Sequence, residues 1–280
     1  MDARRKRSFD DYRMSEEFWQ RLRPLLPEYT ASPKGGRPRA DLRGVADAVF
    51  YRLRVGCQWN AIPPQLAAGS TAHDYFQDWV ARGIFEAVWA AALREYDELV
   101  GIDWRWQSLD GAMTKAPPGG EKTGKNPTDR GKTGTKRSLL TEAEGVPVGL
   151  AVAGANVHDK RLVSGTIEGR PEGCPEPPGG TEQNLCMDKG YDYADTRELV
   201  REVYDYVAHV RSRGEERRDF TQEERAKGNK PRRRVVERTH GWLNRFRAVL
   251  VRWDIYEANH LAGLQLAAAF YTLSLAGVFG

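Results

Sequence analysis

Three acidic side chains in separate segments of the chain have the chemistry of a metal site that acts on phosphodiesters. Asp110 ends an apolar, strand-like stretch, Asp188 ends a second one, and Glu237 lies in a long Arg-rich segment with helical periodicity. Hard divalent cations such as Mg2+ take carboxylate oxygens as ligands. Two such ions held close together can activate a water or hydroxyl and stabilise the leaving oxygen of a phosphodiester. The three acids therefore predict metal-dependent cleavage of nucleic acid.

Helical geometry places Glu237 on the polar side of its segment. At about 100° per residue, the apolar side chains of residues 235–253, Trp242 among them, gather on one side and Glu237 falls opposite. The polar side chains around it are Arg233, Arg234, Asn244, Arg245 and Arg252. One interpretation is a metal-binding carboxylate among phosphate-binding arginines. The alternative is a solvent-exposed face with an ordinary Arg233–Glu237 ion pair, and the other two acids favour the first interpretation.

Positive charge is concentrated in a few places. The net charge is only +4, but residues 1–13 carry a run of four basic residues, and two later segments, 115–137 and 211–234, are rich in Lys and Arg. Such clusters suggest a phosphate partner, although charged runs are also typical of solvated loops. The cations that we expect to contact DNA are Lys122, Lys125, Arg130, Lys132, Lys136, Arg233, Arg234, Arg238 and Arg245. Arg37 and Arg39, in a Gly-Gly-Arg-Pro-Arg segment, could enter a minor groove.

Composition argues against other classes of protein. Cys57, Cys174 and Cys186 have no metal-ligand spacing, and an odd cysteine count without a signal peptide fits a reduced cytoplasm. Residues 261–280 are almost wholly apolar and long enough to span a bilayer. They are rich in Ala and interrupted by polar residues, which favours a buried terminal helix over a membrane span. We therefore expect no membrane association.

Residues 14–100 predict a helical N-terminal domain that follows a basic tail, residues 1–13. Ser15 and Asp41 can each cap a helix, Ser70 can cap another over 71–82, and a further helix fits residues 84–99. Two interpretations stay open. Short helices with tight turns are consistent with a helix-turn-helix DNA reader, for which His73, Gln77 and Arg82 are the polar candidates. A plain helical bundle that packs on the rest of the protein is the alternative.

Residues 102–280 predict an α/β domain. A strand ends at Asp110, a Gly/Pro/Lys loop follows, and strands fit residues 135–141 and 146–155. A helix fits residues 158–168, followed by the strand that precedes Asp188, a helix over 195–203 and a strand over 206–210. A basic loop then leads into the Glu237 helix and the apolar terminal helix. The pattern predicts a mixed five-stranded sheet with flanking helices.

The residues around the three acids form recognisable blocks. The first comprises Leu-Asp-Gly-Ala at 109–112, Asn-Pro-Thr-Asp-Arg-Gly-Lys at 126–132 and Ala-Asn-Val-His-Asp at 155–159. The second is Met-Asp-Lys-Gly-Tyr-Asp at 187–192. The third is Val-Val-Glu-Arg-Thr-His-Gly-Trp-Leu-Asn-Arg-Phe-Arg at 235–247. In this order they closely resemble the DDE transposases of bacterial insertion sequences, specifically the insertion-sequence-five family, over nearly the whole chain.

The resemblance implies an RNase H-like catalytic domain with a specific chemistry. Asp110, Asp188 and Glu237 would bind two Mg2+ ions, with Mn2+ as a substitute, and His158 and Asp192 would support the site. Hydrolysis at a transposon end would leave a 3′-hydroxyl, and the same site would then direct that hydroxyl at target DNA. The implied partners are double-stranded DNA, as terminal inverted repeats and target, and further copies of the chain in a homodimer or higher oligomer. The implied location is the cytoplasm, at the bacterial nucleoid.

Two other functions stay open at this point. One is a metal nuclease of RNase H-like fold that cuts nucleic acid without inserting it. The other is a decayed transposase retained as a DNA-binding protein, which the presence of all three acids disfavours.

Overall fold

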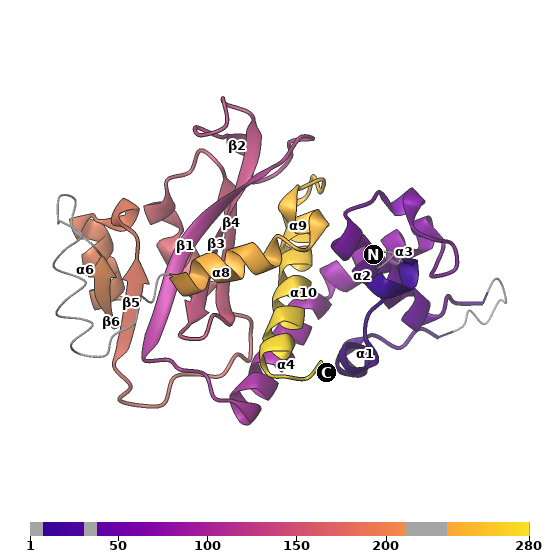
Figure 1. Cartoon of the computed structure of the whole chain (residues 1–280), viewed down its shortest axis with the longest axis horizontal. Helices are drawn as coiled ribbons and strands as arrows, with labels where there is room; N and C mark the ends of the chain where they lie inside the picture. The colour runs from indigo at the N-terminus through magenta and orange to yellow at the C-terminus, as the bar shows by residue number, and fades with distance from the viewer. Residues whose placement is uncertain (1–7, 31–37, 211–233, 280) are drawn as a thin grey trace, which may run out of the picture.

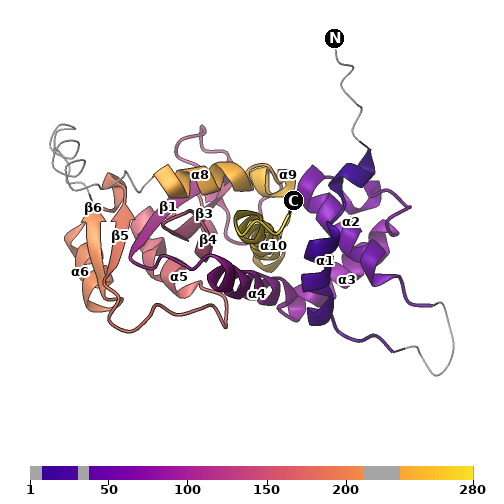
Figure 2. The ribbon, with the colours of Figure 1, turned by 60° about the horizontal axis from the view of Figure 1, so that its bottom comes forward.

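The computed structural model describes residues 8–30, 38–210 and 234–279. The chain begins with helices (Figures 1 and 2). These are η1 (Phe9–Tyr12), α1 (Glu16–Leu22), η2 (Arg23–Leu25), α2 (Leu42–Val55), η3 (Trp59–Ala61), α3 (Gly69–Ala81) and α4 (Ile84–Leu99). Local sequence signals explain most of their starting points. Ser15 caps α1 by accepting from the Phe18 amide at 3.3 Å, and Asp41 caps α2 by accepting from the Gly44 amide at 2.9 Å. The predicted Ser70 cap is wrong, because α3 already begins at Gly69.

A mixed sheet follows the helices. Its strands are β1 (Trp106–Lys115), β2 (Gly124–Lys125), β3 (Thr133–Glu142), β4 (Pro147–Gly154), β5 (Gln183–Met187) and β6 (Tyr206–Val210). Strand β1 is central: β3 pairs with it antiparallel on one side and β5 pairs with it parallel on the other. Strand β4 and the short β2 pair with β3, and β6 pairs with β5. The five predicted strands correspond to β1, β3, β4, β5 and β6, and their order confirms the predicted RNase H-like sheet. The two-residue β2 is a sixth strand, in a segment predicted to be a loop.

Helices cover both faces of the sheet, as Figure 2 shows. On one side, η4 (Asp159–Leu162) and α5 (Val163–Glu168) pack near β4, while α8 (Arg234–Leu243) crosses β1 and β3 on the other. Helix α6 (Ala194–Glu202) packs on β6. The prediction of one long helix through residue 253 is wrong. Helix α8 ends at Leu243, and α9 (Arg247–Leu250) starts after a turn. Arg252, which the helical projection placed beside Glu237, is fully buried elsewhere.

The N-terminal helices and the sheet share one hydrophobic core. Buried side chains run continuously from Phe18 and Trp79 through Leu109 in β1 to Leu273 in the terminal helix α10 (Glu257–Leu275). Helix α4 packs along α10 and buries residues on several sides. The polar candidates for DNA contact lie on α3 or at its end: His73 and Gln77 are half-buried and Arg82 is exposed. Both interpretations of the N-terminal helices, a DNA reader and a plain bundle, therefore stay predictions.

Helix α10 is buried as expected from its apolar composition. In the described part of the chain, no helix is both long and apolar enough to cross a membrane.

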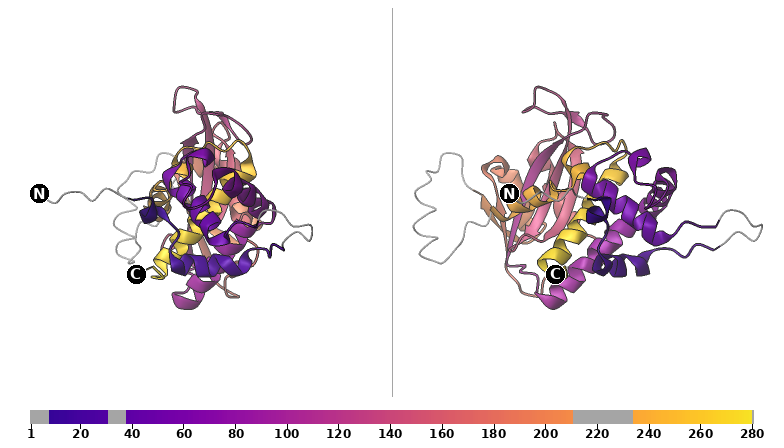
Figure 3. Two further views of the ribbon diagram at one scale, coloured as in Figure 1. Left: turned by 90° about the vertical axis from the view of Figure 1, so that its right-hand side faces the viewer. Right: turned by 45° about the vertical axis from the view of Figure 1, so that its right-hand side comes forward.

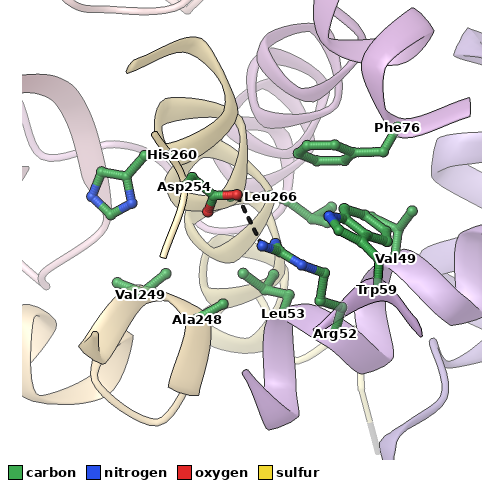
Figure 4. Close-up of a pocket in the computed structure, with 11 residues that line it drawn as sticks. Val49, Arg52, Leu53, Trp59, Phe76, Ala248, Val249, Asp254, His260 and Leu266 are labelled. Carbon is green, nitrogen blue, oxygen red and sulfur yellow. Dashed lines mark hydrogen bonds and ion pairs between the residues drawn. The ribbon is translucent and has the colours of Figure 1, made fainter. Parts of the chain in front are cut away.

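A buried ion pair joins the N-terminal helices to the C-terminal segment. Arg52 of α2 lies 2.9 Å from Asp254, and both side chains are largely shielded from solvent. The guanidinium also stacks on the Trp59 ring, with its carbon 4.5 Å from the ring centroid. Figure 4 shows this contact at the edge of a small pocket between α2, α9 and α10. Parts of the chain that are far apart in sequence are therefore held together by charge as well as by apolar packing.

Candidate active site

Asp110 and Asp188 lie side by side on adjacent parallel strands. Leu109 pairs with Met187 in the register of β1 and β5, so Asp110 and Asp188 occupy the next position on each strand. Adjacent strands lie about 4.8 Å apart, and consecutive side chains project to opposite faces. Both carboxylates therefore leave the sheet on the face opposite Leu109 and Met187. This register explains why the two aspartates are neighbours.

One detail of the prediction for Asp110 is wrong. Strand β1 does not end at this residue but continues to Lys115, because β3 pairs with it along its whole length. Asp110 is thus in the middle of a strand and only Asp188 follows a strand end. The central position holds the Asp110 backbone between two neighbouring strands.

Backbone amides orient both carboxylates. The Gly111 amide donates to Oδ1 of Asp110 at 2.8 Å. Asp188 caps η5 (Lys189–Tyr191), and its Oδ1 accepts from the Gly190 amide. These hydrogen bonds set the direction in which each carboxylate points.

Glu237 lies on α8, which packs against the sheet face of the two aspartates. Arg137 of β3 shows this, because its backbone pairs with Ala112, which shares the Asp110 face, and its side chain reaches α8. Glu237 itself is exposed to solvent. Within the described residues, no group of three His, Cys, Asp or Glu side chains is arranged to hold a metal ion. The structure therefore brings Asp110 and Asp188 together and leaves Glu237 near their face but outside a closed three-carboxylate cluster.

Two buried side chains attach α8 to the strands. Arg137 donates from Nε to Nδ1 of His240 at 3.1 Å, and one of its terminal nitrogens donates to Oδ1 of Asn244 at 2.7 Å. Since Nδ1 of His240 accepts, the ring carries its proton on Nε2, which lies 3.3 Å from the main-chain oxygen of Asp110. This oxygen is a natural acceptor for that proton. A chain of hydrogen bonds thus runs from β3 through α8 to the backbone of Asp110.

Burial determines the protonation of this pair. Burial, with the nearby Arg137 charge, lowers the pKa of His240 to about 3, so the ring stays neutral. Burial also lowers the pKa of Arg137 to about 10, which still leaves the guanidinium charged at neutral pH. A neutral histidine can accept from Arg137 and donate to Asp110 at the same time, which a doubly protonated ring could not do.

Tyr191 provides a buried hydroxyl beside the acids. Its side chain is 2% exposed, and burial together with the carboxylates of Asp159, Asp110 and Asp188 raises its pKa well above the usual value. The hydroxyl lies beside that of Ser138 without the geometry of a hydrogen bond, and it has no other partner among the described residues. Tyr191 therefore stays protonated, with its buried hydroxyl beside Ser138, which pairs with Gly111 and so projects from the face opposite Asp110.

The two residues expected to support the site have structural contacts. Asp192 accepts from Arg197 at 2.8 Å, which fixes the start of α6. His158 caps η4, with Nδ1 accepting from the Lys160 amide at 3.3 Å, and its Nε2 lies 3.3 Å from the Tyr193 hydroxyl. Asp159 is the first residue of η4, and His158 before it is the N-cap.

Lys136 is a correction to the expected DNA-binding set. Its side chain is 5% exposed, and its Nζ lies 2.9 Å from Oδ1 of Asp159 and donates to the Val157 carbonyl at 2.8 Å. A buried ammonium held in this way cannot reach a DNA phosphate. The expected basic segment 115–137 therefore separates into two parts: an exposed loop over 116–132, which we call the basic loop, and buried residues of β3.

The other expected cations that the structure describes are exposed. They are Arg39, Lys122, Lys125, Arg130, Lys132, Arg234, Arg238 and Arg245. Arg39 stacks on the Tyr29 ring and Arg245 on the Trp242 ring. Arg238 donates to the Glu144 carbonyl. Arg37 and Arg233, with the basic segments 1–7 and 211–233, lie outside the described residues.

Sequence reasoning gave no role to Arg137, His240 or Tyr191. The available signal for His240 was its spacing, since it lies three residues after Glu237 and thus one helical turn away on α8. Tyr191 stood inside a recognised block, next to Asp192. Arg137 carried no such signal, because a basic residue in a basic segment is expected to be exposed.

The strand order and the site together define the class of protein. It has an RNase H-like domain in which two aspartates are neighbours on adjacent strands, and a helix that carries a glutamate packs on their face of the sheet. Comparison with known families agrees. Residues 106–272 match the family described as "Transposase DDE domain", and residues 14–89 match "Putative transposase of IS4/5 family (DUF4096)". The chain belongs to the DDE transposases of the IS4/5 type of insertion sequence.

Individual relatives carry similar descriptions. The "Putative transposase for insertion sequence element IS402" of Burkholderia cepacia is 33% identical over 152 residues, which cover 53% of this chain and 67% of that protein. The "Insertion element IS402 uncharacterized 16.2 kDa protein" of the same organism is 25% identical over 118 residues, covering 41% and 80%. Among solved structures, the catalytic domain of the Mos1 mariner transposase is 10% identical with a TM-score of 0.28, over 70% of this chain and 93% of that one. A likeness that weak supports no conclusion by itself.

Proposed function

We propose that this protein binds the terminal inverted repeats of an insertion sequence, cleaves DNA there and joins the resulting 3′-hydroxyl ends to target DNA. The observation that supports this most is the register of β1 and β5, which makes Asp110 and Asp188 neighbours on one face of the sheet. Helix α8 presents Glu237 over that same face, in a chain of the DDE transposase family. The three acids are the proposed catalytic residues.

The donor atoms at this site fit a hard divalent cation. Asp110 and Asp188 offer carboxylate oxygens that amides have already oriented, and two adjacent negative charges are stabilised by a positive ion between them. We propose two Mg2+ ions, with Mn2+ as a substitute, held by these aspartates and by Glu237 after a shift of α8 or its side chain. Bound metal would supply nucleophile activation and leaving-group stabilisation.

Residues of the chain would supply orientation around that chemistry. Arg137 and His240 hold α8 against β1, which fixes the position from which Glu237 approaches. Exposed cations of the basic loop and of α8 would contact backbone phosphates, which position DNA without reading its sequence. Since two ends must be joined, the acting species is a homodimer or larger.

A strand-transfer assay tests the proposal. Purified protein would be mixed with labelled duplex DNA carrying the ends of the element, a supercoiled plasmid and Mg2+, beside Asp188→Asn. The matched control is Asp195→Asn, at an exposed aspartate of α6 that pairs with Lys160 of η4, outside the site. We expect joined product from the wild type and the control, and none from Asp188→Asn.

Other outcomes would contradict parts of the proposal. Cleavage without joining would identify a metal nuclease that does not insert DNA. Binding to the ends with no reaction in Mg2+ or Mn2+ would identify a DNA-binding protein. Equal activity of Asp188→Asn would show that the site is elsewhere.

A further inference from the structure

Exposed aromatic side chains cluster in the short segment between α9 and α10. Trp253 is 56% exposed and Tyr256 is 60% exposed, with Ile255 between them at 54%. Large aromatic side chains are usually buried in a core or an interface, and a group of them on the surface often marks an interaction site. Neither ring is used by the candidate active site.

The segment that carries these rings is firmly held. Arg252 is 0% exposed, and it donates from Nε to the Asp254 carbonyl at 2.8 Å and from a terminal nitrogen to the Ile255 carbonyl at 3.2 Å. The Arg52–Asp254 ion pair fixes the same segment from the side of α2. Trp253 and Tyr256 are therefore presented on a rigid backbone, so that binding through them requires little ordering of the chain.

The same contacts join this segment to the basic loop. The Arg252 amide donates to the Lys115 carbonyl at 2.8 Å, and the Glu121 amide donates to the Ile255 carbonyl at 2.9 Å. At Gly120, where φ is +112°, a Cβ would lie 2.3 Å from that carbonyl, so the close approach requires glycine. Figure 3 shows the loops that follow β1 projecting from one end of the sheet. The aromatic segment and the basic loop thus form one continuous surface.

Charge on this surface favours a polyanion. The exposed cations of the loop are Lys122, Lys125, Arg130 and Lys132. Its two acids already have partners: Glu121 accepts from the Glu257 amide at 2.9 Å, and Asp129 lies 3.7 Å from Lys132 and 3.9 Å from Lys115. Aromatic rings beside a strip of cations are the combination that binds single-stranded nucleic acid, because bases stack on rings while cations contact phosphates.

We propose that Trp253 and Tyr256 form a stacking platform for unpaired bases of the bound DNA, next to the phosphate-binding basic loop. This inference rests on the proposed function for the identity of the nucleic acid. Lys115 lies five residues beyond Asp110 on β1, or about 17 Å at strand spacing. One DNA strand advances about 3.4 Å per nucleotide. The platform would therefore lie several nucleotides along the DNA from the position at which the strand is cut.

Binding measurements without divalent metal test this inference separately from catalysis. Fluorescence anisotropy would report affinity for a labelled single-stranded oligonucleotide and for the same sequence as a blunt duplex. We expect Trp253→Ala and Tyr256→Ala each to weaken single-strand binding by about 5- to 150-fold, the range for losing one base–ring stack. Duplex binding should change little, because paired bases do not offer their faces. Trp253→Phe, which keeps a ring, should restore most of the affinity.

Leu99→Ala is the matched control, because Leu99 is 61% exposed at the end of α4, outside the aromatic segment and the basic loop. Unchanged single-strand binding by both ring-removing variants would overturn the inference. A fall in molecular mass of the DNA-free protein on Trp253→Ala, seen by sedimentation, would instead assign the rings to contact between copies of the chain. Because no cleavage is needed, stacking can be found even if strand transfer fails.

Discussion

Nε2 of His240 lies 3.3 Å from the main-chain oxygen of Asp110. This contact joins the helix that carries Glu237 to the strand that carries Asp110, one helical turn from the glutamate. Arg137 holds the other ring nitrogen and so fixes the tautomer that can donate to Asp110. The relative positions of two proposed catalytic carboxylates thus depend on a buried, neutral histidine.

Replacing this histidine should affect chemistry more than DNA binding. His240→Phe keeps the ring volume but removes the donor to Asp110 and the acceptor for Arg137, so α8 is free to shift. We expect cleavage to fall at least tenfold, which corresponds to ~1.4 kcal/mol in the barrier, with affinity for end DNA unchanged. Single-turnover cleavage and anisotropy would measure the two quantities. Loss of binding in parallel with cleavage would show a general folding defect instead.

Removing the charge of Lys125 should affect DNA binding, whereas removing the charge of Lys136 should affect stability. Lys125→Met should reduce the slope of log affinity against log salt by about 0.9, the value for one lost phosphate contact with duplex DNA. Lys136→Met should leave that slope unchanged and lower the free energy of unfolding by about 1–3 kcal/mol, because the Val157 carbonyl and Asp159 both lose the buried Lys136 ammonium as a partner. DNA titrations at several salt concentrations and urea unfolding test both. A smaller salt dependence of DNA affinity for Lys136→Met than for the wild type would show that Lys136 does contact DNA phosphates.

Glu142 should make the protein less stable as pH rises. Burial raises the pKa of this carboxyl to about 7 from the model-peptide value of 4.5, despite amide hydrogen bonds from Val146 and Glu144. Between these values the folded state binds more protons than the unfolded state, so the free energy of unfolding falls with rising pH, by up to about 1.4 kcal/mol per pH unit. Glu142→Gln should remove this contribution and gain stability relative to the wild type above pH 7. Urea unfolding at several pH values between 4.5 and 7 measures this effect. If Glu142 were ionised throughout, the free energy of unfolding of the wild type and of Glu142→Gln would depend on pH in the same way.

Arg252 should tolerate no replacement, including Lys. Its planar guanidinium donates in several directions to the Asp254 and Ile255 carbonyls and to Oγ1 of Thr135, a geometry that one ammonium cannot reproduce. We expect Arg252→Lys to lower the free energy of unfolding by about 2–4 kcal/mol, since one ammonium cannot replace the donors to the Asp254 carbonyl and to the buried Thr135 hydroxyl together. Denaturant unfolding measures this change. A loss below about 0.5 kcal/mol would mean that water or lysine satisfies the site.

The sequence predicted those parts of the fold that depend on local signals. Helix caps at Ser15 and Asp41 and the order of strands were correct, because capping residues and apolar periodicity act over a few residues. The adjacency of Asp110 and Asp188 followed from the strand order. The extension of β1 beyond Asp110 could not be predicted, because pairing with β3 supplies hydrogen bonds to a segment that is not itself apolar.

Buried charges were the main source of error. Lys136, Arg137 and Arg252 all read as solvent-exposed cations, yet each is buried with partners far along the chain: 21 residues away at Val157, 103 at His240 and 117 at Thr135. A single sequence shows that such a residue is charged but not which distant carbonyl or ring will accept from it. The roles of His240 and Arg137 in positioning α8 required three-dimensional contacts.

The shared core has a consequence for the evolution of this protein. Helix α4, from the N-terminal part, and α10, from the end of the chain, each bury their apolar sides against the other. A recombination joint near residue 100 would leave both surfaces uncovered, and the Arg52–Asp254 pair would lose one member. New N-terminal helices could be acquired only together with matching changes in α10, so the two parts of this chain are constrained to diverge as one inherited unit.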